Sequence, residues 1–317
     1  MNNFFTEAEQ LIQNAQRILI TTHERTDGDD LGTALAFYNH LSENGKDVTI
    51  SIVGGVPKQL RFLPGSEVVI EDITETNFDL LIISGCSNLT RIGNEKVSGL
   101  AIPIINIDHH RDNKYYGTVN IVDPVKSSVA ELAFDFFKFN NWPISASIAT
   151  NLLTGIFTDT GSFMHSNTES STFQAASELM RKGALLNTVA KNTFGGKDVK
   201  ALHAWGRALE NTYFDSRNKI IYSIITDKDL KELGNVPPSV FEGLVETINK
   251  VPDAKMALFL KQDGEIIKGS LRSELYKGIN VSNVAKLFGG GGHALASGFS
   301  LVGKLIKDET GKWQVVT

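Results

Sequence analysis

Residues 101–111, which read AIPIINIDHHR, place an acid and two adjacent histidines directly after a short apolar run. The run is rich in isoleucine, which suits a strand buried on both faces of a parallel sheet. Open α/β sheets bind ligands at the carboxyl ends of their strands, so Asp108, His109 and His110 fall where a site is expected. Neutral imidazole binds divalent transition metals, and a nearby carboxylate orients it. The pattern indicates a metal site, with two surface histidines in a turn as the alternative.

The rest of the chain predicts the fold around this strand. Similar apolar runs at 17–22, 47–53 and 79–84 alternate with helical patterns, which is typical of a parallel, doubly wound sheet. A chain of 317 residues exceeds the usual size of one core. We therefore expect an α/β protein with a doubly wound N-terminal domain and a smaller α/β C-terminal domain. The expected boundaries are 1–190 for the first domain, 191–209 for a helical linker and 210–317 for the second.

Composition limits the class of protein. The hydrophobic fraction of 41% and charged fraction of 21% suit a soluble globular protein. A net charge of −5 argues against an extended basic cradle for nucleic acid, although it leaves room for a local basic pocket. The single cysteine, Cys86, excludes an internal disulfide and fits a reducing cytoplasm. No signal peptide or membrane span is expected, so we predict a cytoplasmic protein.

Two further loops carry candidate metal ligands. The segment 23–30, HERTDGDD, follows a predicted strand and supplies His23, Asp27 and Asp29; a solvated acidic turn capping the next helix is the alternative. Asp159 follows a predicted helix at 144–157, where an ordinary helix-ending turn is the alternative. Mixed carboxylate and imidazole ligands suit Mn²⁺ or, less selectively, Co²⁺, Zn²⁺ or Mg²⁺. Two such ions can clamp a phosphoryl group.

A glycine tract in the C-terminal part is a candidate anion site. Residues 289–293 read GGGGH, and glycine lets backbone N–H groups approach phosphate oxygens closely. No Lys-Ser or Lys-Thr follows, so this is not a Walker loop, and a flexible hairpin connection is the alternative. Arg272, on a predicted strand of the same domain, is a candidate clamp for phosphate, or an arginine on a solvated face.

These motifs, in this order, resemble the DHH phosphoesterase family. Residues 22–29 resemble its first motif, 108–110 its third and 158–161 its fourth, while 290–293 with 296–298 resemble the signature of its associated C-terminal domain. The resemblance spans nearly the whole chain. It is strongest to the branch of bacterial oligoribonucleases (nanoRNases) and phosphoadenosine-phosphate phosphatases.

The resemblance implies a metal-dependent phosphoesterase. Its substrates would be short RNA or DNA oligonucleotides or phosphoadenosine phosphate, hydrolysed by metal-activated water. His23 and Asp27 would hold one ion, typically Mn²⁺, and Asp29, His109 and Asp159 a second. Asp108 would support a ligating imidazole, and His110 would lie near the scissile phosphate. The substrate would be held in the C-terminal domain by Arg272, Gly290, Gly291, Gly292 and His293.

One departure from the family pattern affects this expectation. The second motif of the family ends a strand with an aspartate that bridges both metals. Alignment on Arg91 places Gly85 at that position. Loss of the bridging carboxylate would weaken at least one metal site, so the chain would bind either one or two ions. Thr26 and Asp30 replace the usual proline and alanine of the first motif, and Asp30 adds a carboxylate close by.

The departure leaves a second class of function open. A catalytically weakened or inactive homologue that retains nucleotide binding would act as a sensor or scaffold. Another phosphoanhydride enzyme, such as a pyrophosphatase or a cyclic-dinucleotide phosphodiesterase, is a third alternative. The oligomeric state also stays open, with a homodimer as one alternative.

Overall fold

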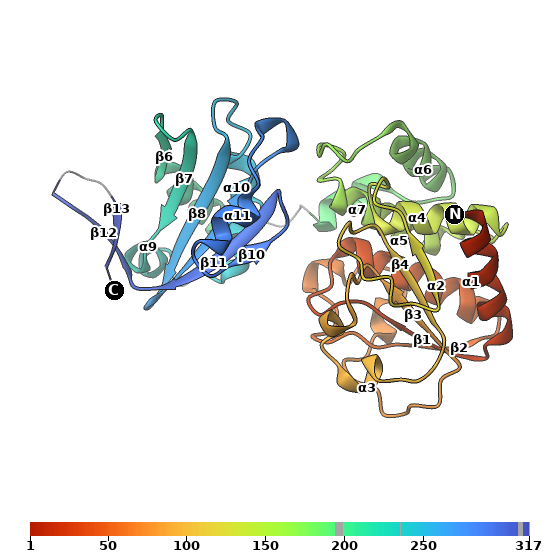
Figure 1. Ribbon diagram of the computed structural model, residues 1–317. Helices are drawn as coiled ribbons and strands as arrows, with labels where there is room; N and C mark the ends of the chain where they lie inside the picture. The colour runs from red at the N-terminus through yellow and green to blue at the C-terminus, as the bar shows by residue number, and fades with distance from the viewer. Residues whose placement is uncertain (194–198, 235, 310–312, 317) are drawn as a thin grey trace. The chain divides into compact units, whose positions relative to one another are not determined.

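The apolar run before His109 forms β4 (Ile104–Asp108), a strand of the N-terminal sheet in the computed structural model (Figure 1). The structure describes residues 1–193, 199–234, 236–309 and 313–316. They form two units, Met1–Gly196 and Lys197–Thr317. The DHH-like motifs lie in the first unit and the glycine tract in the second.

The N-terminal sheet is wholly parallel, with the strand order β2-β1-β3-β4-β5. The other strands are β1 (Arg17–Thr21), β2 (Asp47–Ile50), β3 (Leu80–Ser84) and β5 (Val119–Val122). The chain moves outward from β1 to β2 and then returns to β3 on the other side of β1. In this order the switch point lies between β1 and β3, where open sheets bind ligands.

Apolar strands arise here because both faces of the sheet are buried. Along β1, Ile18 and Ile20 pack into the core beneath the helices, whereas Leu19 packs into a second core on the opposite face. The helical side contains α1 (Asn2–Asn14), α2 (Gly28–Glu43) and α4 (Val129–Phe139), with α5 (Ala146–Asp159) packed on α2 and α4. Also in this unit are α6 (Ser170–Arg181) and α7 (Leu186–Thr193). Short α3 (Glu95–Ser98) and η3 (Leu89–Ile92) contribute to the opposite core.

The C-terminal unit has a mixed six-stranded sheet in the order β10-β11-β9-β8-β7-β6. Its strands are β6 (Thr212–Asp215), β7 (Ile220–Ile225), β8 (Met256–Asp263), β9 (Ile266–Arg272), β10 (Gly291–Gly292) and β11 (Ala296–Val302). Only β7 and β8 pair in parallel among these described strands. A separate pair is formed by β12 (Lys304–Lys307) and β13 (Trp313–Val316).

Helices complete two apolar cores in this second unit. Residues of α8 (Val199–Glu210), η4 (Pro238–Phe241) and α10 (Leu244–Ile248) form one core with β7 and β8. The other core contains α11 (Val281–Lys286) together with β9 and β11. A further helix, α9, spans Asp227–Glu232. The predicted α/β class with a parallel N-terminal sheet is confirmed.

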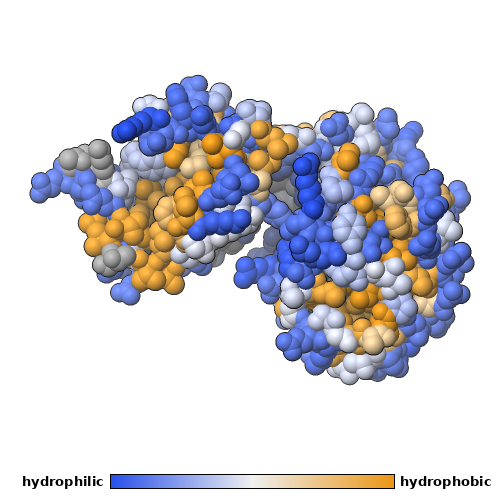
Figure 2. Space-filling model, in the orientation of Figure 1, coloured by the Kyte–Doolittle hydropathy of each residue, from blue (hydrophilic) through white to orange (hydrophobic). Residues whose placement is uncertain are grey.

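The surface shows no membrane-spanning element among the described helices, since none is both long and apolar enough to cross a bilayer. Figure 2 shows mostly hydrophilic surface interrupted by apolar patches. Exposed apolar side chains of the C-terminal unit include Leu275, Tyr276, Leu287 and Val302.

Candidate metal centre

The loop between β1 and α2 directs three acids toward the switch point of the sheet. Asp27 is the N-cap of α2, and its Oδ1 accepts hydrogen bonds from the backbone N–H groups of Asp29 (2.9 Å) and Asp30 (3.1 Å). The acidic loop therefore does cap the next helix, which was the alternative interpretation of this segment. It also places Asp29 and Asp30 in the first helical turn, where both are buried, with exposed fractions of 3% and 2%.

The first cluster of potential ligands consists of His23, Asp27 and Asp30, with one ligand atom from each lying within 4.8 Å of the others. Nδ1 of His23 lies 2.5 Å from the backbone oxygen of Glu24, and Nε2 lies 2.6 Å from Oδ2 of Asp30. Burial lowers the pKa of His23 and so favours the neutral ring. A neutral imidazole beside two carboxylates is a suitable donor set for a divalent ion.

The second cluster consists of Asp29, His109 and Asp159, again within 4.8 Å of one another. Nδ1 of His109 lies 3.1 Å from the backbone oxygen of Lys126, and Nε2 lies 3.6 Å from Oδ2 of Asp159. The last residue of α5 thus meets the residue that follows β4. The sequence-predicted ligands His23, Asp27, Asp29, His109 and Asp159 are brought into these two clusters.

The two histidines have the same orientation. In each, Nδ1 faces a backbone carbonyl oxygen, which can only accept a hydrogen bond, so Nδ1 carries the proton. Nε2 of each ring then faces a carboxylate oxygen, of Asp30 or of Asp159. A shared proton or a bound cation would satisfy both atoms of each pair. Metal-binding histidines typically show this arrangement, with the second nitrogen donating to a carbonyl or carboxylate.

Burial strongly perturbs the carboxyl groups of both clusters. It raises the pKa values of Asp29 and Asp30 well above the usual range, and neighbouring carboxylates raise them further. Burial and the charge of Asp27 also raise the pKa of Asp159, although His109 opposes this shift. A divalent ion would offset the mutual repulsion and favour the ionised forms.

Asp29 is held by a second helix. Its Oδ2 accepts from the backbone N–H of Val129 (2.7 Å) and its Oδ1 from that of Ala130 (2.8 Å), in the first turn of α4. The positive end of the helix therefore stabilises the Asp29 carboxylate.

Asp108 orients the histidine that lies outside both clusters. Its fully buried carboxylate accepts from the backbone N–H groups of His109 and His110, from Nδ1 of His110 (2.6 Å) and from Nδ2 of Asn113 (2.5 Å). Burial alone would raise the pKa of Asp108, but the bonds from His110 and Asn113 outweigh it and lower that pKa. Burial likewise opposes protonation of His110, yet Asp108 raises the pKa of His110.

The structure adds residues that the motifs did not identify as parts of the site. Arg91, used above only to align the second motif, lies close enough to oppose protonation of His23 and His110 electrostatically. Asn113 supports Asp108, and its position five residues downstream carried no recognisable signal. Asp30, noted only as an extra carboxylate, belongs to the first cluster.

The predicted substrate residues lie near one end of the C-terminal sheet. In β10, Gly291 pairs with Gly298 and Gly292 with Ser297, while Arg272 on β9 pairs with Ala296. Nε of Arg272 donates to Oε1 of Glu246 at 2.8 Å, so its guanidinium already has an acidic partner.

The glycine tract contains both packing and open positions. A Cβ atom on Gly290 would lie 2.1 Å from the oxygen of Gly298, so packing on β11 requires this glycine, whereas one on Gly291 would contact nothing within 4 Å. His293 is exposed, and its backbone oxygen accepts from Oγ of Ser297 at 2.7 Å. A hollow beside the tract is lined by residues of β9 and β11, including Lys268, which sequence reasoning missed.

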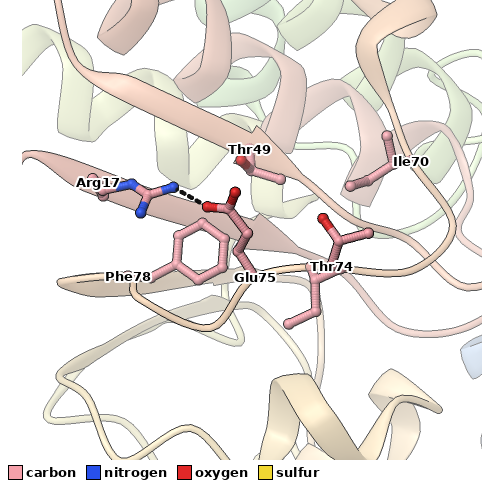
Figure 3. A pocket seen from close by; sticks show the side chains of 7 residues that line it. Arg17, Thr49, Ile70, Thr74, Glu75 and Phe78 are labelled. Atoms are coloured by element: carbon pink, nitrogen blue, oxygen red, sulfur yellow. Dashed lines mark hydrogen bonds and ion pairs between the residues drawn. The ribbon is translucent and has the colours of Figure 1, made fainter.

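A pocket elsewhere on the N-terminal unit contains no predicted site residue. It lies around the start of β1 and the segment before β3, and is lined by Arg17, Thr49, Ile70, Ile73, Thr74, Glu75 and Phe78 (Figure 3). Arg17 is already ion-paired with Glu75 (2.6 Å) and Asp47 (3.1 Å), so it is not a free anion clamp. The acids and histidines cluster instead near the carboxyl ends of β1 and β4.

Comparison with known proteins agrees with this arrangement. Residues 17–156 match the model of the DHH family N-terminal domain, and residues 218–309 match that of the DHHA1 domain. The bifunctional oligoribonuclease and PAP phosphatase NrnA of Thermus thermophilus is 30% identical over 287 residues, or 90% of this chain and 84% of that protein. NrnA of Bacillus subtilis is 26% identical, with 93% of each chain covered.

A solved structure extends the similarity to the fold. The exopolyphosphatase-related protein from Bacteroides fragilis superimposes with a TM-score of 0.90 at 25% identity, covering 96% of this chain and 92% of that one. Both family models and the similarity along the chain lead to one assignment. The chain belongs to the DHH family of phosphoesterases.

Proposed function

We propose that this chain is a metal-dependent phosphoesterase that hydrolyses short oligonucleotides, phosphoadenosine phosphate or both. One divalent ion would be held by His23 and Asp27 and the other by Asp29, His109 and Asp159. Mn²⁺ is the first candidate because the donors combine imidazole nitrogen with carboxylate oxygen; Co²⁺, Mg²⁺ and Zn²⁺ are the alternatives.

The common orientation of His23 and His109 carries this proposal. Each ring is fixed through Nδ1 by a backbone carbonyl, and each Nε2 faces a carboxylate oxygen at 2.6 or 3.6 Å. Surface histidines in an acidic turn have no reason to share this geometry. Bound divalent ions supply neutralisation of phosphate charge and a lowered pKa of coordinated water.

Residues of the chain would bind and orient the phosphate beside these ions. His110, whose pKa is raised by Asp108, would donate a hydrogen bond from Nε2 to a phosphate oxygen. Asp108 would hold that ring through Nδ1, and Arg91 would add positive charge nearby. In the C-terminal unit, Arg272, Gly290, Gly291, Gly292 and His293 would bind the nucleotide.

The substrate class is supported by the relatives. The curated names from Thermus thermophilus and Bacillus subtilis both specify oligoribonuclease and PAP phosphatase, and the similarity covers both units of this chain. Short substrates also agree with the net charge of −5, which does not favour an extended basic channel.

The test is a substrate panel with purified protein. We expect Mn²⁺-dependent release of mononucleotides from RNA of two to five residues, or of phosphate from phosphoadenosine phosphate, and loss of turnover with EDTA. Asp159→Asn is the matched control, since it removes a charged ligand at nearly constant volume. Absence of turnover across the panel with Mn²⁺, Co²⁺, Mg²⁺ and Zn²⁺ would refute the proposal.

A further inference from the structure

We propose that Asp30, from the first turn of α2, supplies to the first metal the carboxylate that Gly85 lacks at the end of β3. The inference deepens the proposed function and rests on it. It makes Asp30 a metal ligand in place of an acid on the second motif. The first metal would then be held by His23, Asp27 and Asp30, with Asp30 providing the carboxylate that the family takes from the second motif.

The first observation is that Asp30 occupies the space of a side chain at position 85. A Cβ atom built on Gly85 would lie 1.4 Å from Oδ1 of Asp30 and 2.3 Å from its Cγ. Two atoms cannot approach so closely, so an aspartate at 85 and the observed Asp30 carboxylate exclude each other. The Asp30 carboxylate, which belongs to α2, therefore occupies the space that a side chain at the end of β3 would fill.

Backbone contacts hold the two positions together. Oγ of Ser84 donates to the backbone oxygen of Asp30 at 3.1 Å, which attaches the start of α2 to the end of β3. The N–H of Gly85 donates to the oxygen of Ile107 at 2.9 Å, which attaches the same point to β4. The juxtaposition therefore belongs to the framework of the sheet.

The second observation is that the buried Asp30 carboxylate points at the imidazole of His23. Asp30 is 2% exposed, and the contact of its Oδ2 is with the ring of His23. That oxygen lies 2.6 Å from Nε2 of His23, whose proton is directed from Nδ1 to Glu24. With Asp27, these two side chains bring one ligand atom each within 4.8 Å of one another, a donor set that suits a divalent ion.

The sequence departures acquire a common explanation. The resemblance places alanine at position 30 and aspartate at position 85, whereas this chain has Asp30 and Gly85. Each change alone is unfavourable: an acid at 30 overlaps an acid at 85, and glycine at 85 removes a metal ligand. Together they exchange the element from which the carboxylate comes. Gly85 is thus not by itself a sign of a degenerate site.

The experiment compares four variants with the wild type: Asp30→Ala, Asp30→Asn, Gly85→Asp and the double variant Asp30→Ala/Gly85→Asp. Equilibrium dialysis of the full-length apoprotein against Mn²⁺ measures ions per chain and their Kd, and far-UV circular dichroism checks folding. Asp30→Asn keeps the side-chain volume and removes the charge, so it separates ligation from packing.

We expect Asp30→Ala and Asp30→Asn each to weaken the first Mn²⁺ at least 10-fold in Kd, as loss of a ligand should. Gly85→Asp alone should also weaken binding, because its side chain enters the space of the Asp30 carboxylate. The double variant should recover a Kd within about 10-fold of wild type, since the two sites interact directly and their effects are not additive.

Different results identify which proposal fails. Wild-type protein that binds no Mn²⁺ would overturn the proposed metal-dependent function. Wild-type protein that binds two ions, with unchanged Kd values in Asp30→Ala or Asp30→Asn, would overturn only the role of Asp30. A folded double variant no better than either single variant would contradict the exchange of the two carboxylates.

Discussion

Two adjacent glycines of the C-terminal tract should respond in opposite ways to a single methyl group. In Gly290→Ala, the added Cβ would lie 2.1 Å from the oxygen of Gly298 and 2.6 Å from Cβ of Phe299. The backbone overlap should lower the free energy of unfolding by about 1–3 kcal/mol. In Gly291→Ala the methyl meets nothing, and φ is not positive, so lower entropy of the unfolded chain should raise stability by about 0.4–1 kcal/mol.

The catalytic activity of Gly291→Ala should fall even though its stability rises. The N–H of Gly291 faces its strand partner Gly298, so if a substrate phosphate lies against the open face of Gly291, the methyl group in Gly291→Ala displaces it from a neighbouring donor. Loss of one hydrogen bond to a charged group is worth about 1.5–3 kcal/mol, which lowers kcat/KM by about 10- to 100-fold. Gly291→Ala should therefore be the more stable and the less active protein.

The assay combines urea denaturation with kcat/KM on a diribonucleotide in the presence of Mn²⁺. Bound Mn²⁺ per chain serves as the control, because both substitutions lie outside the N-terminal unit. A Gly291→Ala enzyme with wild-type kcat/KM would show that the open glycine does not contact substrate. A Gly290→Ala protein as stable as wild type would refute the packing argument.

Three further results are expected. Hydrogen bonds from Ser127 and the charge of Lys126 outweigh burial and lower the pKa of Glu131, so the stability that its carboxylate contributes is present above the usual pKa of 4.5 and lost as pH falls through the folded pKa. Glu131→Gln should reduce the free energy of unfolding by about 1–3 kcal/mol at pH 7 and weaken the fall of stability at acid pH. An unchanged fall of stability with acid would contradict this. His109→Ala should reduce bound Mn²⁺ from two ions to one in equilibrium dialysis, and retention of both would exclude its ligand role. Burial raises the pKa of Cys86 to about 11, so iodoacetamide at pH 8 should leave the native thiol unmodified and activity intact; rapid labelling measured by mass spectrometry would refute its inertness.

The strands of the N-terminal sheet were the most predictable elements. Burial on both faces makes β1, β3 and β4 continuous apolar runs, as Ile18 and Leu19 illustrate by packing into different cores. In the C-terminal unit, Arg272 lies on β9, as the predicted strand required. The two-residue strand β10 was not predicted, because pairing between Gly291 and Gly298 leaves no side-chain periodicity to recognise.

The chemical types in the site were predictable, but their exact partners were not. Motifs at strand and helix ends identified His23, His109 and Asp159 as ligand candidates, and their clustering follows from the parallel sheet. The sequence could not show that Asp30 fills the space beside Gly85, because that contact depends on how α2 packs at the end of β3. The resemblance made Gly85 noticeable, while the structure supplied the steric reason for it.

The hydrogen bonds from the first turn of α4 to Asp29 connect assembly of the site with folding of the domain. Both carboxylate oxygens bind N–H groups at positions 129 and 130, a hundred residues along the chain. The first turn of α4 and the first turn of α2 therefore stabilise each other before any ion arrives. Ion capture can then occur at a prearranged acid, without ordering a loop, and the amides of Val129 and Ala130 should exchange with solvent only when this part of the domain opens. Evolution would have little freedom to abandon Asp29 even in a relative that had lost catalysis.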